Sequence, residues 1–370
     1  MRFSLSRRTS LRAATLISAS ALGISGIAAT AADAKASARA SSTTPIVTAV
    51  APAKALDGEV LNVGDQAGTG AEAVLEAAGL IKVSGSSGVL KDGLHVTWDD
   101  FTSGPPILEA EEAGAVDIGG VGDAPPIFAD PTGKVVIVGV LKSTYDNAAL
   151  LVPANSPITS VSQLVGKTVA VGTGTSADYH LLTVLEKAGV SPSSVTHDSL
   201  SGAAGLAALE SGSVAAFDTW SPWVEDAEAQ GARVLVTGAP YGSPYSYQVA
   251  SAEALKNPKK VLAIRDYLTE LDKAYVWVKS HPSFWAHTWS TVTSLPFTVT
   301  SAATLDDPYT PIPLTSSIVA QEQDVLDGFA SAGEIPSKYD IAQYASSAFA
   351  GAVTGDWPAT TTTKHKKKKS

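Results

Sequence analysis

The stretch VAVGTGTSADYHLLTVLEKAG, residues 169–189, joins a short apolar strand, a glycine-rich turn and an amphipathic helix. Gly172, Gly174 and Ala177 have the G-x-G-x-x-A spacing of dinucleotide-binding loops, and Asp198 lies near where a ribose-binding acid would be sought. The same strand-to-helix turn also suits a small anion, because the N–H groups and the dipole of a helix start favour negative charge. Features elsewhere in the chain decide between the two ligands.

Short apolar strands and amphipathic helices alternate along residues 56–350, which is typical of an α/β fold. Two extended apolar segments, near 145–153 and 243–251, interrupt this alternation. The body is longer than one hydrophobic core usually supports, so we expect two lobes joined by two extended hinge crossings. Each lobe is expected to hold a largely parallel sheet flanked by helices, with a ligand between the lobes. The predicted lobes are 56–147 with 246–350, and 148–245.

The two ends of the chain predict export. An arginine-rich start precedes an apolar run over 13–29, which predicts a signal peptide over 1–31, and SRRTSLR is similar to a twin-arginine signal. Residues 32–55 read as a flexible linker and 351–370 as a disordered basic tail. We expect a periplasmic or extracellular protein, associated with the membrane or cell wall through its partner or this tail. Export argues against an NAD-dependent enzyme, because the soluble pool of NAD stays in the cytoplasm.

Charge and cysteine content exclude several function classes. The chain has no cysteine, which removes disulfides, thiolate nucleophiles and cysteine metal sites. Residues 36–363 hold 16 lysines and arginines against 35 aspartates and glutamates, a net charge of −19. Such a body is unsuited to nucleic acid or polyphosphate, and we expect a monomer without metal or cofactor. A bound anion should be small and held mainly by backbone N–H groups and hydroxyls.

Three helix starts share one design, in which a strand ends, a Ser, Thr or Asp follows, and a helix begins. They are TSGPPILEA (102–110), GDAPPIFA (122–129) and GTGTSADY (172–179). In the first two, proline at the start of the helix has no N–H to lose, so the next amides are left available. Each start alone is ordinary capping, but three aimed at one point would hold a monoanion without arginine. We expect Asp178, three residues after Thr175, to serve its own helix end.

FDTWSPW, residues 217–223, is the most unusual stretch. Trp220 and Trp223 would either wall the apolar body of a ligand or pack the core between the lobes. Asp218 would bind a cationic group such as an amine if it faces the cleft, and would otherwise cap a helix. The chain has neither a G-x-S-x-G nucleophile elbow nor an H-E-x-x-H motif, and we find no acid–base constellation. We therefore do not expect an enzyme.

Six segments, taken in order, resemble the aliphatic-sulfonate-binding proteins of ABC importers, a group that includes binders of taurine, nitrate and pyrimidine precursors. They are VGDQAG, DFTSGPPILEA, GAVDIGGVGDAPPIFA, ALLVPANSPITSVSQLVGKTVAVGTGTSADYHLLTVLEKAG, FDTWSPW and VLDGFASAGEIPSKYDI. The resemblance covers about 56–345 and implies a type II periplasmic-binding-protein clamshell. It also implies a binding protein that captures an alkanesulfonate or taurine and delivers it to an ABC permease.

In that family the sulfonate lies among the first-strand loop, the G-D-x-P-P turn and the glycine/serine helix start of the second lobe. With Ser103, Asp218 and Tyr247 added from the residue patterns, the candidate ligand-binding residues are Gln66, Ser103, Gly122, Asp123, Pro125, Thr173, Gly174, Thr175, Ser176, Asp218, Trp220, Trp223 and Tyr247. Ala215 and Ser221 stand where sulfonate binders often have Asp, and Asp218 stands where they often have a small residue. An acid in the wall would suit an aminosulfonate such as taurine.

Three alternatives stay open at this point. The ligand could be another small anion, such as nitrate. An enzyme on the same fold is the second, because the resemblance extends to sulfinate desulfinases and thiamine-pyrimidine synthases. These rely on cysteine or histidine, and the missing cysteine argues against the desulfinase. The third is a sensor domain that signals to a membrane partner.

Overall fold

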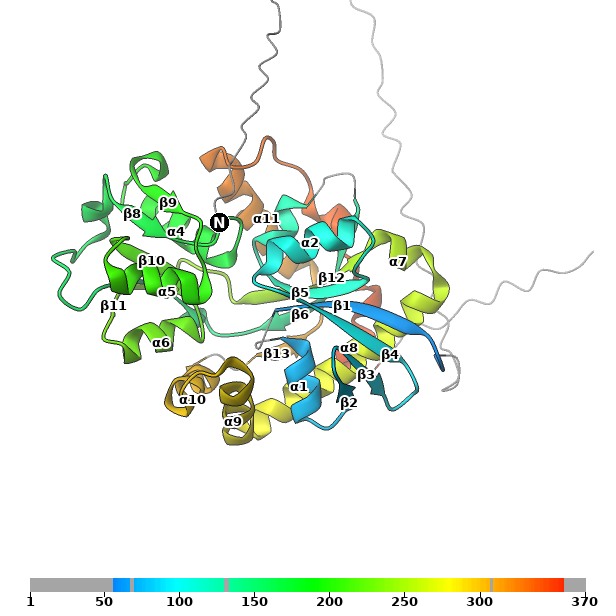
Figure 1. Cartoon of the computed structure of the whole chain (residues 1–370). Coiled ribbons are helices and arrows are strands. Elements are labelled where there is room, and N and C mark those ends of the chain that lie inside the picture. Colours follow the sequence, from blue (N-terminus) through cyan, green and yellow to red (C-terminus); the bar gives the residue numbers. More distant parts are fainter. Residues whose placement is uncertain (1–55, 67–69, 130–132, 307–308, 356–370) are drawn as a thin grey trace, which may run out of the picture. The chain divides into compact units, whose positions relative to one another are not determined.

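The computed structural model describes residues 56–66, 70–129, 133–306 and 309–355, and it shows two β-sheets with helices packed around them (Figure 1). The first sheet has eight strands in the order β13-β6-β12-β5-β1-β4-β3-β2, and the second has five in the order β11-β7-β10-β8-β9. The predicted signal peptide and linker lie outside the described residues. So does the predicted tail beyond residue 355, whereas residues 351–354 form a short helix, which corrects the expectation of disorder there.

The strands of the first sheet come from two separate parts of the chain. They are β1 (Val60–Gln66), β2 (Ile81–Ser84), β3 (Ser87–Leu90), β4 (His95–Phe101), β5 (Ile118–Gly122), β6 (Val135–Lys142), β12 (Tyr245–Ser251) and β13 (Thr310–Ile312). The helices from the same parts of the chain are α1 (Ala71–Ala77), α2 (Gly104–Glu112), α3 (Pro125–Phe128), α7 (Ala252–Lys256), α8 (Pro258–Ser280), α9 (Pro282–Thr293), α10 (Phe297–Asp306), α11 (Ser316–Ala332) and α12 (Gly351–Thr354).

The second sheet is built from the intervening part of the chain. Its strands are β7 (Ala148–Val152), β8 (Thr168–Ala170), β9 (Thr196–Asp198), β10 (Ala216–Trp220) and β11 (Arg233–Thr237). The helices of this part are α4 (Ser176–Lys187), α5 (Gly202–Ser211) and α6 (Trp223–Ala229). Short 3₁₀ turns are η1 (Tyr145–Asn147), η2 (Val161–Leu164), η3 (Pro192–Ser194), η4 (Ile341–Tyr344) and η5 (Ser347–Phe349). The α/β class and the two sheets agree with the prediction, while the lobe boundaries stay a prediction.

Both sheets are mixed, which corrects the expectation of largely parallel sheets. β1 pairs in parallel with β4 and β5, and β8 with β9 and β10. However, β12 is antiparallel to β5 and β6, and β7 is antiparallel to β10 and β11. The reason is that the two segments predicted as hinge crossings are themselves strands inside the sheets. β2 and β3 form an antiparallel hairpin that was not predicted.

Apolar side chains at helical spacing anchor the helices on the sheets. In α4, Leu181, Val184 and Leu185 are buried against the second sheet. On the first sheet, α1, α8 and α9 pack on one face, while α2 and α11 pack on the other (Figure 1). The contacts of α4 hold its N-terminal turn in place beside the strand ends. None of the helices in the described ranges is long and apolar enough to span a bilayer.

Candidate functional site

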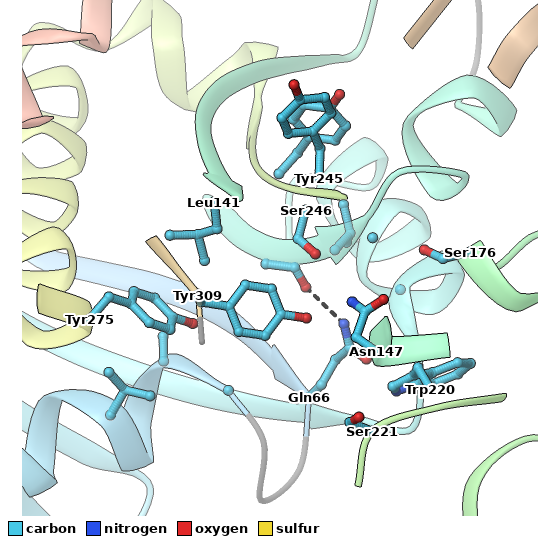
Figure 2. A pocket seen from close by; sticks show the side chains of 18 of the residues that line it. Gln66, Leu141, Asn147, Ser176, Trp220, Ser221, Tyr245, Ser246, Tyr275 and Tyr309 are labelled. Carbon is cyan, nitrogen blue, oxygen red and sulfur yellow. Dashed lines mark hydrogen bonds between the residues drawn. The ribbon is translucent and has the colours of Figure 1, made fainter. Parts of the chain in front are cut away.

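A pocket with a volume of about 280 Å³ is lined by residues from both sheets (Figure 2). Three strands end at it, β1 with Gln66, β5 with Gly122 and β10 with Trp220. Helix α4 begins at it with Ser176. Open α/β sheets place their ligands at the carboxyl ends of strands, so this is the position at which a site is expected.

One side of the pocket is polar and uncharged, and we call its residues the polar cradle. They are Gln66, Gly122, Asn147, Thr175 and Ser176. The two amides are held in place by the backbone and by a hydroxyl. Gln66 Nε2 donates to the carbonyl of Gly120 at 3.1 Å, and Asn147 Nδ2 donates to Ser143 Oγ at 3.0 Å.

The tightest contact in the polar cradle joins Gly122 to Ser176. A Cβ atom placed on Gly122 would lie 2.0 Å from Ser176 Oγ, so a larger residue here would displace that hydroxyl. Next to it, the backbone N–H of Asp123 donates to Ser176 Oγ at 3.3 Å. The end of β5 and the start of α4 therefore meet without any intervening side chain.

The three predicted helix starts converge on this pocket. Gly104, Pro125 and Ser176 are the first residues of α2, α3 and α4, and all three line it. The N-cap residues of these helices make no side-chain cap hydrogen bond. The positive ends of the helix dipoles are thus directed to one volume, an arrangement that favours an anion.

A fourth helix start, that of α1, is occupied by a carboxylate of the chain itself. Asp65 accepts hydrogen bonds from the N–H groups of Ala71 at 2.8 Å and Glu72 at 3.1 Å. Burial raises the pKa of Asp65 to about 6. Asp65 also lines the pocket. The sequence analysis missed this role, which an aspartate six residues before a helix does not reveal.

Asp178 serves its own turn, as expected from the sequence. Its Oδ2 accepts from the N–H of Gly174 at 2.8 Å, one residue before the N-cap Thr175. The side chain is buried, and burial raises its pKa to about 6. The N–H of Gly174 is therefore already bonded to the Asp178 carboxylate, while Thr175 and Ser176 line the pocket.

The structure brings together about half of the candidate residues. Those that line the pocket are Gln66, Gly122, Pro125, Thr175, Ser176, Trp220 and Tyr247. Those that do not line it are Ser103, Asp123, Thr173, Gly174, Asp218 and Trp223. Asp123 is fully buried, and burial raises its pKa to about 6. Thr173 is exposed and donates to Ser199 Oγ at 2.9 Å, whereas Trp223 packs against the cluster under α5.

Asp218 does not face the pocket, which corrects the expectation that it would read an amine or cap a helix. It is completely buried, and its Oδ1 and Oδ2 lie 2.9 and 3.0 Å from Nδ1 of His180. Nε2 of His180 lies 3.1 Å from the carbonyl oxygen of Thr237. Both ring nitrogens face oxygen atoms, an environment that favours the imidazolium form of His180. Burial alone would lower the pKa of His180, but the Asp218 carboxylate outweighs it and the pKa is raised.

The other side of the pocket was not foreseen, and we call it the aromatic compartment. Its residues are Tyr275, Val278, Pro282, Trp285, Trp289, Leu305 and Tyr309. In Figure 2, Tyr275 and Tyr309 lie on the side opposite Ser176 and Trp220, and the ring of Tyr309 reaches toward Gln66 and Asn147. Trp285 and Trp289 are four residues apart in a helix, a spacing that does not distinguish packing in the core from contact with a ligand.

Metal ligation is not supported in the described part of the chain. There, no group of three histidine, aspartate or glutamate side chains is placed to hold a metal ion. Among the described residues, the pocket has one cationic lining residue, Lys279, which is exposed and donates to Thr310 Oγ1 at 3.2 Å.

Known proteins match both the sequence and the fold. A family described as "ABC transporter, phosphonate, periplasmic substrate-binding protein" matches residues 95–293. The chain is 32% identical over 251 residues to an aliphatic sulfonates-binding protein of Escherichia coli (strain K12), covering 67% of this chain and 78% of that protein. It is 28% identical over 200 residues to the taurine-binding periplasmic protein of the same organism, covering 53% and 61%.

A solved structure agrees with these matches. The alkanesulfonate-binding protein SsuA from Xanthomonas axonopodis pv. citri, bound to MOPS, superposes with a TM-score of 0.70 at 28% sequence identity. The superposition covers 78% of this chain and 99% of that one. The similarity therefore extends over both sheets.

Proposed function

Because the chain belongs to the family of periplasmic substrate-binding proteins of ABC transporters, we propose that it captures a small sulfonate-type anion and delivers it to a membrane permease. The relatives named for sulfonates and taurine support this ligand class. The membership confirms the resemblance drawn from the sequence. By the same reasoning, the protein acts outside the cytoplasm and binds its ligand without converting it.

The observation that carries this proposal is the contact of Gly122 with Ser176 in the polar cradle. Around it, three helices begin at one volume, and the hydroxyl and amide groups of the cradle provide uncharged donors. A sulfonate is permanently charged and accepts hydrogen bonds on all its oxygens. Backbone and hydroxyl donors therefore suit it without any proton exchange.

A phosphonate is the second candidate, because the matching family is described by that ligand. At neutral pH a phosphonate carries more negative charge than a sulfonate, and proteins usually match such charge with arginine or lysine. The polar cradle has neither, and the one lining lysine in the described residues, Lys279, is exposed and follows Val278 of the aromatic compartment in α8. The geometry thus favours the monoanion.

Calorimetry with the purified protein tests the proposal. The ligand panel is ethanesulfonate, taurine, ethylphosphonate, nitrate and sulfate. We expect saturable binding of at least one sulfonate with a Kd below about 1 mM, and weaker binding of ethylphosphonate. Absence of sulfonate binding would contradict the ligand class. Release of sulfite or sulfate from a bound sulfonate would instead indicate an enzyme.

A further inference from the structure

The aromatic compartment forms the less polar part of the pocket wall. Val278 and Tyr275 enter it from α8, Trp285 from α9 and Leu305 from α10. None of these side chains offers a charge. A ligand that occupied only the polar cradle would leave this apolar wall in contact with water.

The wall is rigid where the tryptophans form it. Trp285 and Trp289 stack with ring centroids 5.6 Å apart, and they are only 6% and 7% exposed. Both belong to the core cluster that fixes α1, α8 and α9 on the first sheet. Tyr275 and Tyr309 form a tilted pair with centroids 6.1 Å apart (Figure 2). These rings therefore provide a preformed apolar surface.

The volume is larger than a two-carbon sulfonate requires. On the measure in which about 10–15 Å³ is enough to hold one water, the cavity of about 280 Å³ has room for many waters. A sulfonate group with an ethyl chain fills only part of that space. Displacing the remaining water from the aromatic compartment with an apolar group would be favourable.

The compartment also lacks a group that would select an amine. Among the lining residues that the structure describes, Asp65 is the one acid. Both of its oxygens already accept hydrogen bonds from the start of α1, Oδ1 from Ala71 and Oδ2 from Glu72. A short ammonium ligand such as taurine would have to compete with that cap.

We propose that the aromatic compartment receives an apolar, ring-sized body, and that the preferred ligand is a ring-bearing sulfonate such as an arylsulfonate. This inference rests on the proposed function, because it assigns the sulfonate group to the polar cradle. The ring then lies against Trp285 and the two tyrosines. Taurine and ethanesulfonate bind through the sulfonate group alone.

Calorimetry on the full chain tests the inference with benzenesulfonate, cyclohexanesulfonate, ethanesulfonate and taurine. We expect benzenesulfonate to bind at least about tenfold more tightly than ethanesulfonate. A saturated ring that binds equally well would still support an apolar body. If benzenesulfonate binds no better than ethanesulfonate, the inference is wrong while the proposed function stands. If no sulfonate binds, the proposed function fails as well.

A pair of matched variants on α8 locates the ring. Val278→Phe fills the compartment, whereas Val276→Phe makes the same change at a side chain that is 61% exposed and outside the pocket. We expect Val278→Phe to remove most of the preference for benzenesulfonate over ethanesulfonate, and Val276→Phe to leave that ratio unchanged. Equal loss of both ligands in Val278→Phe would place the ring elsewhere and overturn the assignment. Circular dichroism confirms that both variants are folded.

Discussion

The imidazolium of His180 and the carboxylate of Asp218 form an ion pair inside the second sheet's core, at 2.9 Å and without solvent exposure. The pair connects α4 to β10, and both elements end in residues that line the pocket, Ser176 and Trp220. A third partner, the Thr237 carbonyl, ties the imidazole to β11. The pair therefore fixes the start of α4 relative to the end of β10, where both elements line the pocket.

Removing the charge of Asp218 should destabilise the protein strongly. Asp218→Asn leaves the His180 imidazole buried without its anion, and such losses cost about 3–5 kcal/mol. The free energy of unfolding, measured by urea denaturation at pH 6, is expected to fall by that amount. Asp198→Asn, at an exposed aspartate at the end of β9, is the control and should change it little. A small effect of Asp218→Asn would show that the pair is not ionised.

The same pair predicts a pH dependence. The pKa of His180 is raised above its ordinary value of 6.5 in the folded protein, so His180 contributes stability that is present below pH 6.5. That stability is lost as pH rises through the folded pKa. Melting temperatures of the wild type should decline across this range, and Asp218→Asn should abolish the decline. An unchanged decline in the variant would assign it to another group.

Three buried aspartates predict a second trend at lower pH. Burial raises the pKa of Asp65, Asp123 and Asp178 to about 6, so the folded protein keeps these protons to higher pH than the unfolded chain. The contribution of these three groups to the free energy of unfolding is fully present below the ordinary aspartate pKa of about 4. It is lost as pH rises through about 6. We expect a higher melting temperature at pH 5 than at pH 6.5, a range below the pH at which the His180 contribution is lost. The reverse order would mean that other acids dominate.

Ser176→Ala should weaken sulfonate binding without affecting folding. The hydroxyl lies in the polar cradle, and a hydrogen bond to a charged group is worth about 1.5–3 kcal/mol, which corresponds to roughly tenfold or more in Kd. Calorimetry with ethanesulfonate measures the change. Ser316→Ala is the matched control, because Ser316 is also the first residue of a helix but is exposed on α11. Equal affinities of the two variants would remove Ser176 from the site.

Gly122→Ala should weaken the same ligand through Ser176. Its Cβ would lie 2.0 Å from Ser176 Oγ, so the hydroxyl must turn away and lose its bond to the N–H of Asp123. In a Ser176→Ala background the obstacle is gone, and Gly122→Ala should cost little more. A double-mutant cycle with ethanesulfonate measures this coupling. Additive losses would show that the two residues act independently.

The order of strands and helices could be predicted because apolar periodicity is a local property. Strands and helices alternate over 56–350 as predicted, and the strand and helix predicted within 169–189 are β8 and α4. Pairing direction could not be predicted, because it depends on which sheet a segment joins. The segments at 145–153 and 243–251 were correctly predicted to be extended. Their antiparallel pairing as β7 and β12 depends on tertiary contacts, which a local pattern does not show.

The polar cradle was predictable in part for the same reason. Gly122 and Ser176 stand at strand-to-helix turns, which sequence marks by glycine and small polar residues. Asp218 was misassigned because a strand does not reveal which face a polar side chain takes. A signal was present, however: His180 shares the apolar helix face with Ala177 and Val184, so it needed a buried partner.

The contact of Gly122 with Ser176 limits how this protein can be changed. A side chain at Gly122 would push the Ser176 hydroxyl away, so this position is poorly suited to change. Variation in ligand choice must then arise at the tyrosines and the valine on the far wall. A designer who wished to redirect the protein to a new cargo would leave the anion head group alone and remodel α8.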